Sequence, residues 1–145
     1  MTAKVLQVCT SETKGIQKSP VDKVEVVVGF GIQGDAHGGD WHRQVSLLAD
    51  ESAQLMRDKG ADVGPGDFGE NILTTGIDLP ALPIGTKIRM GGVELEVTQI
   101  GKECHTRCAI YNAAGTCVMP TQGIFCRVLR GGTLLPGTAV DTIVP

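Results

Sequence analysis

The sequence predicts a mostly β protein that folds into a closed or partly closed β-barrel with one or two short helices. The first observation is composition: 20 of the 145 residues are glycine and seven are proline, and the average glycine share is only roughly 7%. The second is that short runs of alternating apolar residues recur along the chain. Short strands joined by tight turns produce this pattern, and closure into a barrel removes exposed strand edges.

Strands are expected where apolar residues alternate or run together between turn residues. The expected strands cover residues 3–10, 21–28, 44–49, 71–74, 87–90, 93–100, 124–129 and 139–144. Gly91-Gly92 lies between two of them and predicts a two-residue hairpin turn of the primed type. A helix is expected from Asp50, as its N-cap, to about Lys59, with Gly60 at its C-terminal end.

Length and charge narrow the class of protein. A chain of 145 residues fits one domain, 1–145, and a net charge of −3 gives no general attraction to nucleic acid. No apolar run approaches the roughly 18 residues of a membrane span, and Met1 to Cys9 lacks the apolar region of a signal peptide. We therefore expect a cytoplasmic protein with neither a nucleic-acid nor a membrane partner.

The cysteines indicate thiol or metal chemistry. Their number, five, is odd, which argues against a disulfide framework. Cys104 and Cys108 lie among basic side chains that favour the thiolate, the form that attacks sulfur and binds soft metals; these side chains are Lys102, His105 and Arg107. We expect Cys104 to be the working thiol, with Cys108 as a rival or resolving partner. Cys117 and Cys126 are expected to be packed and dispensable.

A zinc site is the alternative interpretation of the same window. Its ligands are Cys104, Cys108, Cys117 and His105. The spacing Cys-x3-Cys-x8-Cys is not a common one for structural zinc.

Two glycine-containing windows supply further candidate binding residues. In the window from Gly34 to Arg43, glycines expose backbone amides that can hold an anion, and His37, His42 and Arg43 add positive charge. Asp35 can orient one of the imidazoles. The second window, Gly66–Asn71, is a polar entry to a strand and contains Glu70. Both windows can also be read as ordinary turns between strands.

These windows, in this order, resemble the MOSC domain. The matching segments are Gly31–His37 (Gly-Ile-x-Gly-Asp-x-His), Arg43–Leu48, Gly66–Asn71, Ile84-Gly85 and the region of Cys104. The name denotes the C-terminal domain of molybdenum cofactor sulfurases, which also occurs as small stand-alone bacterial proteins. The resemblance extends over nearly the whole chain. It implies a strand-rich, barrel-like fold that binds molybdenum cofactor or handles sulfur through one cysteine.

The resemblance also implies which residues form the site. Cys104 best matches the family's cysteine and is the implied molybdenum ligand, although Arg107-Cys108 resembles the Arg-Cys pair of the larger mitochondrial-type members. The candidate cofactor-binding residues are Gly34, Asp35, His37, His42, Arg43, Glu70, Asn71, Lys102, His105 and Arg107. Nothing resembles a pyridoxal-phosphate lysine site, so a partner protein is expected to do the desulfurase or redox work.

Two functions of different classes follow. The first is a module that binds molybdenum cofactor or carries sulfur through a cysteine thiolate, as a persulfide or a molybdenum ligand, in cofactor or metal–sulfur assembly. It acts with a sulfur-donor or molybdoenzyme partner and is sulfurtransferase-like. The second is a molybdenum-cofactor-dependent reductase of N-hydroxylated compounds, as the resemblance allows for some members. The sequence has no haem, flavin or iron–sulfur signature of a self-sufficient electron-transfer enzyme.

Overall fold

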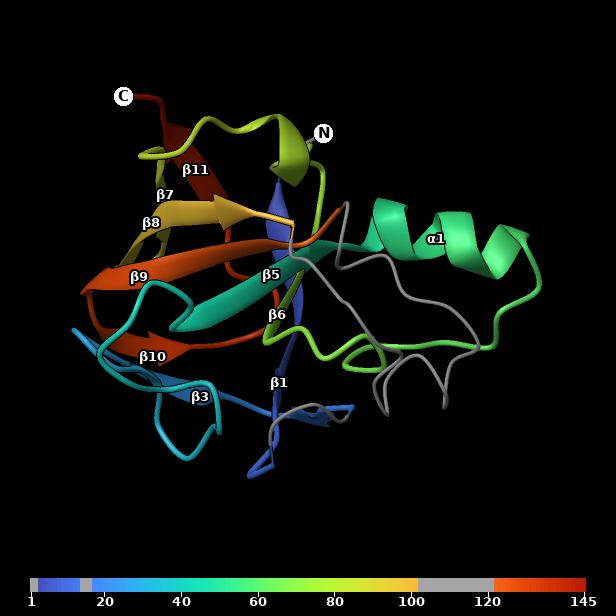
Figure 1. Cartoon of the computed structure of the whole chain (residues 1–145), viewed down its shortest axis with the longest axis horizontal. Coiled ribbons are helices and arrows are strands. Elements are labelled where there is room, and N and C mark those ends of the chain that lie inside the picture. The colour runs from blue at the N-terminus through green and yellow to red at the C-terminus, as the bar shows by residue number, and fades with distance from the viewer. Residues whose placement is uncertain (1–2, 14–16, 102–121) are drawn as a thin grey trace.

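Most of the regular secondary structure consists of strands in two sheets, and α1 follows β5 directly (Figure 1). The computed structural model describes residues 3–13, 17–101 and 122–145. The elements are β1 (Lys4–Thr10), β2 (Ser19–Val21), β3 (Val24–Val27), β4 (Gly31–Ile32), β5 (Val45–Ala49), α1 (Asp50–Asp58), β6 (Ile72–Thr75), the 3-10 helix η1 (Leu79–Ala81), β7 (Lys87–Met90), β8 (Val93–Ile100), β9 (Ile124–Arg130), β10 (Gly132–Leu134) and β11 (Val140–Ile143).

The larger sheet has eight strands in the order β11-β7-β8-β9-β5-β6-β1-β2, and β10-β3-β4 form a smaller sheet. All named pairs are antiparallel except β5 with β6, which is parallel. The β11 end of the larger sheet also meets β1, the neighbour of the other end strand, because Val5 N–H donates to the Thr138 carbonyl at 2.8 Å and Val140 N–H to the Ala3 carbonyl at 2.9 Å. These bonds make the larger sheet a partly closed barrel, as the sequence predicts.

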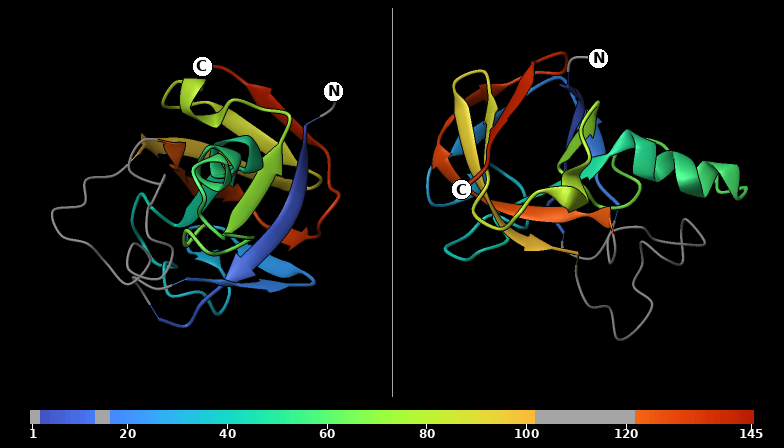
Figure 2. Two further views of the ribbon diagram at one scale, coloured as in Figure 1. Left: turned by 90° about the vertical axis from the view of Figure 1, so that its right-hand side faces the viewer. Right: turned by 90° about the horizontal axis from the view of Figure 1, so that it is seen from above.

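The barrel encloses the main core, and a second core lies under the helix. β5 is buried along its whole length because its alternate side chains face both. Leu47 belongs to the barrel core with Val5 and Leu95. Leu48 belongs to the helix-side core, whose other members are Ala53, Met56, Val63, Phe68, Leu73 and Phe125. The helix therefore packs on the outside of the barrel and projects from it (Figure 2).

The turn between β7 and β8 confirms the hairpin prediction. Met90 pairs with Val93, and Gly91 has a φ of 60°, which is the positive value that the first residue of a primed turn requires. The expected strand 21–28 is shorter in the structure. Its main extended part is Val24–Val27, in which Val24 and Val26 are buried and Glu25 and Val27 are exposed, while Val21 belongs to β2.

The N-terminus of α1 corrects the sequence expectation. Asp50 was expected to cap the helix, but it is the first helical residue, and the N-cap is Ala49, whose side chain makes no capping bond. The reason is that buried strand β5 continues without a turn into the helix. The Asp50 carboxylate instead accepts a 2.7 Å hydrogen bond from Arg57 Nη2. Gly60, with a φ of 97°, follows the end of the helix as predicted.

None of the helices in the described ranges combines the length and apolarity needed to cross a lipid bilayer.

Candidate functional site

The segment between β4 and β5, residues 33–43, carries most of the candidate binding residues and is called the histidine loop here. It begins with a turn at Gly34, whose φ of 82° is readily adopted by glycine. The Asp35 N–H donates to the Ile32 carbonyl at 3.1 Å, which closes this turn. The turn directs the Asp35 side chain into the protein, where it is fully enclosed.

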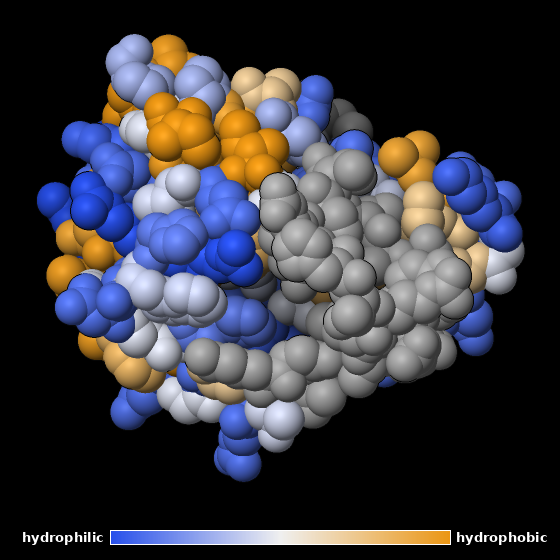
Figure 3. All heavy atoms as spheres, viewed as in Figure 1, coloured by the Kyte–Doolittle hydropathy of each residue, from blue (hydrophilic) through white to orange (hydrophobic). Residues whose placement is uncertain are grey.

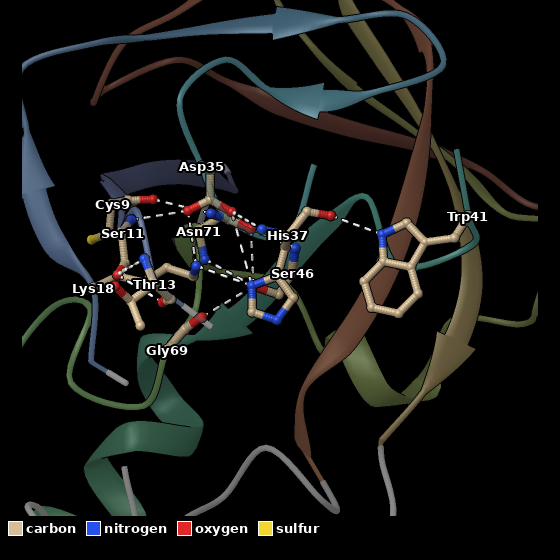
Figure 4. A network of polar contacts seen from close by, with 10 residues as sticks. All are labelled: Cys9, Ser11, Thr13, Lys18, Asp35, His37, Trp41, Ser46, Gly69 and Asn71. Carbon is tan, nitrogen blue, oxygen red and sulfur yellow. Dashed lines mark hydrogen bonds and ion pairs between the residues drawn. The ribbon is translucent and has the colours of Figure 1, made fainter. Parts of the chain in front are cut away.

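Asp35 is the centre of a buried polar cluster with Lys18 and His37 (Figure 4). Lys18 Nζ lies 2.8 Å from Asp35 Oδ1 and 3.1 Å from His37 Nδ1. The backbone N–H groups of Ser11 and His37 also donate to the carboxylate, each at 3.0 Å. Burial opposes ionisation of Asp35, but the bonds from Lys18, Ser11 and His37 outweigh it and lower the pKa.

The expected anion-holding amides are therefore partly in use by the protein itself. The His37 amide, which a nest would offer to a ligand, donates to the Asp35 carboxylate. The His37 carbonyl accepts a 2.8 Å hydrogen bond from Trp41 Nε1, so this contact lies within the histidine loop. Asp35 and His37 lie in one cluster, but Lys18 Nζ is nearer to the imidazole nitrogen, at 3.1 Å, than the Asp35 carboxylate is, at 3.9 Å.

A second, more exposed cluster joins the end of the histidine loop to β8. His42 Nε2 lies 2.9 Å from Gln99 Oε1, and Arg43 Nε donates to the same oxygen at 3.0 Å. Gln99 Nε2 donates to the Gly101 carbonyl at 2.7 Å. The Arg43 guanidinium also lies over the Phe125 ring, 5.3 Å from its centroid. Arg43 thus presents positive charge, and His42 and Arg43 both present ring or guanidinium nitrogens, at the end of β8.

A surface pocket of about 450 Å³ lies beside this cluster, between the histidine loop and strands β8 and β9. Its volume is within the range of small-molecule sites, about 300–1,000 Å³. Hydrophilic side chains gather on this face of the molecule (Figure 3). Lining residues include Asp40, Trp41, His42, Gln44, Thr98 and Arg127.

The Gly66–Asn71 segment stabilises its own backbone. Glu70 is enclosed and accepts hydrogen bonds from the Gly66 N–H at 2.9 Å and the Phe68 N–H at 3.2 Å. Burial raises the pKa of Glu70 to about 7, although these two bonds oppose the rise. Asn71 is also enclosed and bonds to the Ser46 N–H and the Cys9 carbonyl. Their binding role stays a prediction, while their observed contacts are internal.

The remaining predicted site residues lie outside the described residues. They are Lys102, Cys104, His105, Arg107 and Cys108, together with Cys117. Gly101 and Gly123 flank this segment, and the Gly101 N–H donates to the Gly123 carbonyl at 2.6 Å. In the parts that the structure does describe, no three His, Cys, Asp or Glu side chains are grouped as metal ligands.

The cysteines that the structure describes are core residues. Cys126 is fully buried in β9, as expected, and burial raises its thiol pKa far above the usual range. Burial also raises the pKa of Cys9 to about 12. Both thiols are therefore protonated and unreactive near neutral pH.

Sequence reasoning missed two residues of the clusters. Lys18 directly precedes the short edge strand β2, and nothing in its sequence neighbourhood distinguishes it from a surface lysine. Gln99 ends an alternating strand, and its amide carries no signal of function. Each of these residues belongs to its cluster because it bonds to a residue distant in sequence, and a local sequence motif cannot reveal such a contact.

Comparison with known proteins agrees with this architecture. No curated protein matches the chain in sequence. Among solved structures, the chain is similar to the YuaD protein from Bacillus subtilis, with a TM-score of 0.80 and 23% identity, covering 98% of this chain and 96% of that one. It is also similar to YiiM from Geobacillus stearothermophilus, with a TM-score of 0.74 and 19% identity over 97% of this chain and 75% of that one.

YiiM from Escherichia coli gives a TM-score of 0.70 at 18% identity, covering all of this chain and 71% of that one. These identities support the shared fold alone. The family model for the MOSC domain matches residues 33–141, which include the histidine loop, the cluster of His42, Arg43 and Gln99, and strands β5 to β10. The chain belongs to the MOSC domain family.

Proposed function

We propose that the chain binds molybdenum cofactor or carries sulfur through the Cys104 thiolate, as a single domain acting with a partner protein. The observation that carries this proposal is the bridge made by Gln99. Its side chain bonds at one end to His42 and Arg43 and at the other to Gly101, three residues before Cys104. The bridge attaches the cationic end of the histidine loop to the strand that leads into the cysteine window.

The donors of this region fit the chemistry of the cofactor. Molybdenum cofactor has an anionic phosphate tail and a flat pterin rich in hydrogen-bonding groups. Arg43 offers guanidinium N–H groups suited to phosphate oxygens, and the exposed His42 side chain lies beside it. In the proposed complex the metal would be held by the cofactor's dithiolene sulfurs and by the Cys104 thiolate.

The chain's own chemistry is that of a thiolate. Bound cofactor supplies a redox-active metal, while Lys102, His105 and Arg107 favour the ionised Cys104. In the sulfur-carrier role, the Cys104 thiolate attacks the outer sulfur of a donor protein's cysteine persulfide. A new S–S bond forms on Cys104, the donor's S–S bond breaks, and the donor cysteine leaves as a thiolate. Every sulfur and electron is accounted for without a further oxidant.

The test is loading of the purified full chain. The protein is made in a cell that produces molybdenum cofactor, and bound metal, pterin fluorescence and persulfide mass are measured. We expect near-stoichiometric molybdenum and pterin, or a sulfur atom added to Cys104 after incubation with a cysteine desulfurase. Cys104→Ser is expected to abolish the loading, and Arg43→Ala to weaken it about tenfold through loss of a charge-assisted bond.

Cys117→Ser is the matched control and is expected to load as the unchanged chain does. Full loading of Cys104→Ser contradicts the assignment of the thiol. Absence of molybdenum, pterin and persulfide from the unchanged chain contradicts the function itself. Reduction of an N-hydroxylated compound by the loaded chain with a chemical reductant alone favours the reductase alternative.

A further inference from the structure

Lys18 faces the imidazole of His37 as well as the Asp35 carboxylate. Its Nζ lies 3.1 Å from His37 Nδ1 and 2.8 Å from Asp35 Oδ1, and its side chain is only 1% exposed. Figure 4 shows the three side chains directed toward one another. The Asp35 carboxylate stabilises the Lys18 ammonium. Because the pair is buried, water is kept from replacing the ammonium as the partner of the carboxylate.

The contact between Lys18 and His37 constrains where the imidazole holds its proton. A lysine ammonium has three N–H donors and no acceptor. A hydrogen bond between the two nitrogens therefore requires that His37 Nδ1 contribute a lone pair. A neutral imidazole whose Nδ1 accepts a bond holds its single proton on Nε2.

Asp35 alone favours the opposite arrangement. Its Oδ2 lies 3.9 Å from His37 Nδ1, and a carboxylate at this place attracts a proton onto that nitrogen. Lys18 is the nearer group, and Oδ2 already accepts the His37 backbone N–H at 3.0 Å. The ammonium thus prevents a histidine–carboxylate pair that the other two residues are placed to form.

We propose that Lys18 is a positioning residue that, held by Asp35, keeps His37 as the neutral tautomer protonated on Nε2. In this form Nε2 is an N–H donor and carries no metal-binding lone pair. The ring is then suited to an acceptor oxygen, whether of the protein or of a ligand, and unsuited to metal ligation through Nε2. Only the choice of ligand rests on the proposed function; the tautomer does not.

His42 provides an internal reference. Gln99 Nε2 donates to a carbonyl, so Gln99 Oε1 is the atom that faces His42, and His42 Nε2 must be the donor of their bond. His42 is therefore also protonated on Nε2, but its tautomer is set by the Gln99 amide and not by a buried ion pair. A change at Lys18 leaves this second bond intact.

The experiment is nitrogen NMR of the full chain labelled with ¹⁵N-histidine, at about pH 8, above the ordinary histidine pKa of about 6.5. The three histidine signals are assigned with single His→Gln variants. In the unchanged chain we expect His37 to be neutral and protonated on Nε2. In Lys18→Met we expect the ratio of the Nδ1-protonated to the Nε2-protonated form of His37 to rise about tenfold, because Asp35 is then the nearest charge. A tenfold change in this ratio corresponds to one pKa unit.

His42 is expected to give the same spectrum in both proteins, which controls for a general change of structure. Lys18→Arg retains a donor-only cation and is expected to keep the tautomer. Protonation of His37 on Nδ1 in the unchanged chain overturns the proposal, as does an unaltered His37 signal in Lys18→Met. If Lys18→Met does not fold, a correlation across the bond between the Lys18 ammonium and His37 Nδ1 decides, and its absence overturns the proposal. Loading with cofactor enters none of these readouts.

Discussion

Asp35 and Glu70 are both carboxylates enclosed by the protein, yet their surroundings act on their charges in opposite directions. Asp35 has the Lys18 ammonium 2.8 Å away and two backbone donors. Glu70 has backbone donors, among them the N–H groups of Gly66 and Phe68, and no cation is among the causes of its pKa shift. The pKa of Asp35 is lowered, whereas burial raises that of Glu70 to about 7, with Asp67 adding repulsion.

The difference shows what a buried carboxylate needs. Backbone hydrogen bonds alone do not outweigh the loss of water around the Glu70 charge, but an adjacent cation together with such bonds does so at Asp35. The two sites therefore have opposite effects on stability as pH changes. Ionised Asp35 stabilises the fold at neutral pH, and this contribution is lost as pH falls below the ordinary aspartate value toward its lowered pKa.

Removal of the Asp35 charge is expected to have the largest effect. Asp35→Asn leaves the Lys18 ammonium buried without a counter-ion, and breaking a buried pair in this way costs about 3–5 kcal/mol. Urea unfolding at neutral pH measures the loss. The double variant Asp35→Asn/Lys18→Met removes both charges and is expected to recover part of it. A loss below about 1 kcal/mol in the single variant would show that the pair is not the main partner of either charge.

Glu70→Gln is expected to change how stability varies with pH. Because the folded pKa of about 7 exceeds the ordinary 4.5, the folded state binds more protons between these values, and stability falls as pH rises. The shift corresponds to about 3 kcal/mol lost by the unchanged chain between about pH 4.5 and pH 8. Glutamine does not titrate, so the stability difference between the variant and the unchanged chain shifts by this amount in favour of the variant.

Urea unfolding at a series of pH values provides the measurement. Glu12→Gln, at an exposed glutamate, is the matched control and is expected to leave the pH profile unchanged. At acid pH, Glu70→Gln is expected to be less stable by about 1–3 kcal/mol, since the amide nitrogen cannot accept one of the two backbone N–H groups. Parallel pH profiles for Glu70→Gln and the unchanged chain would contradict the raised pKa.

The contrast between Asp35 and Glu70 also shows which features of the fold and of the site could be predicted from the sequence. The fold depends on periodic patterns, and alternation such as Val24 and Val26 in β3 places the strands within a few residues. Asp35 and His37 could be selected because both lie in one short glycine-rich window. The Lys18 ammonium, which distinguishes the surroundings of Asp35 from those of Glu70, does not follow from such a window.

The residues missed are those that act across the chain. Lys18 meets Asp35 from 17 positions away, and Gln99 meets Arg43 from 56. The N-cap at Asp50 was wrong for a related reason: a buried strand continues into the helix, so Ala49 takes the cap position without a side-chain bond. Tertiary packing decides each of these cases, whereas local residue preference decides the Gly91-Gly92 turn.

An exposed ion pair gives the smallest expected effect and completes the comparison. Arg127 Nε lies 2.6 Å from Glu96 Oε1 between β9 and β8, a shorter contact than that of Lys18 with Asp35, but the Arg127 side chain is 54% exposed. Water and salt screen such a pair, so Arg127→Ala is expected to cost less than about 1 kcal/mol, and less still at high salt. A double-mutant cycle with Glu96→Gln isolates the pair from lost packing. A coupling as large as that of Lys18 with Asp35 would contradict the view that burial, not distance, sets the strength of these pairs.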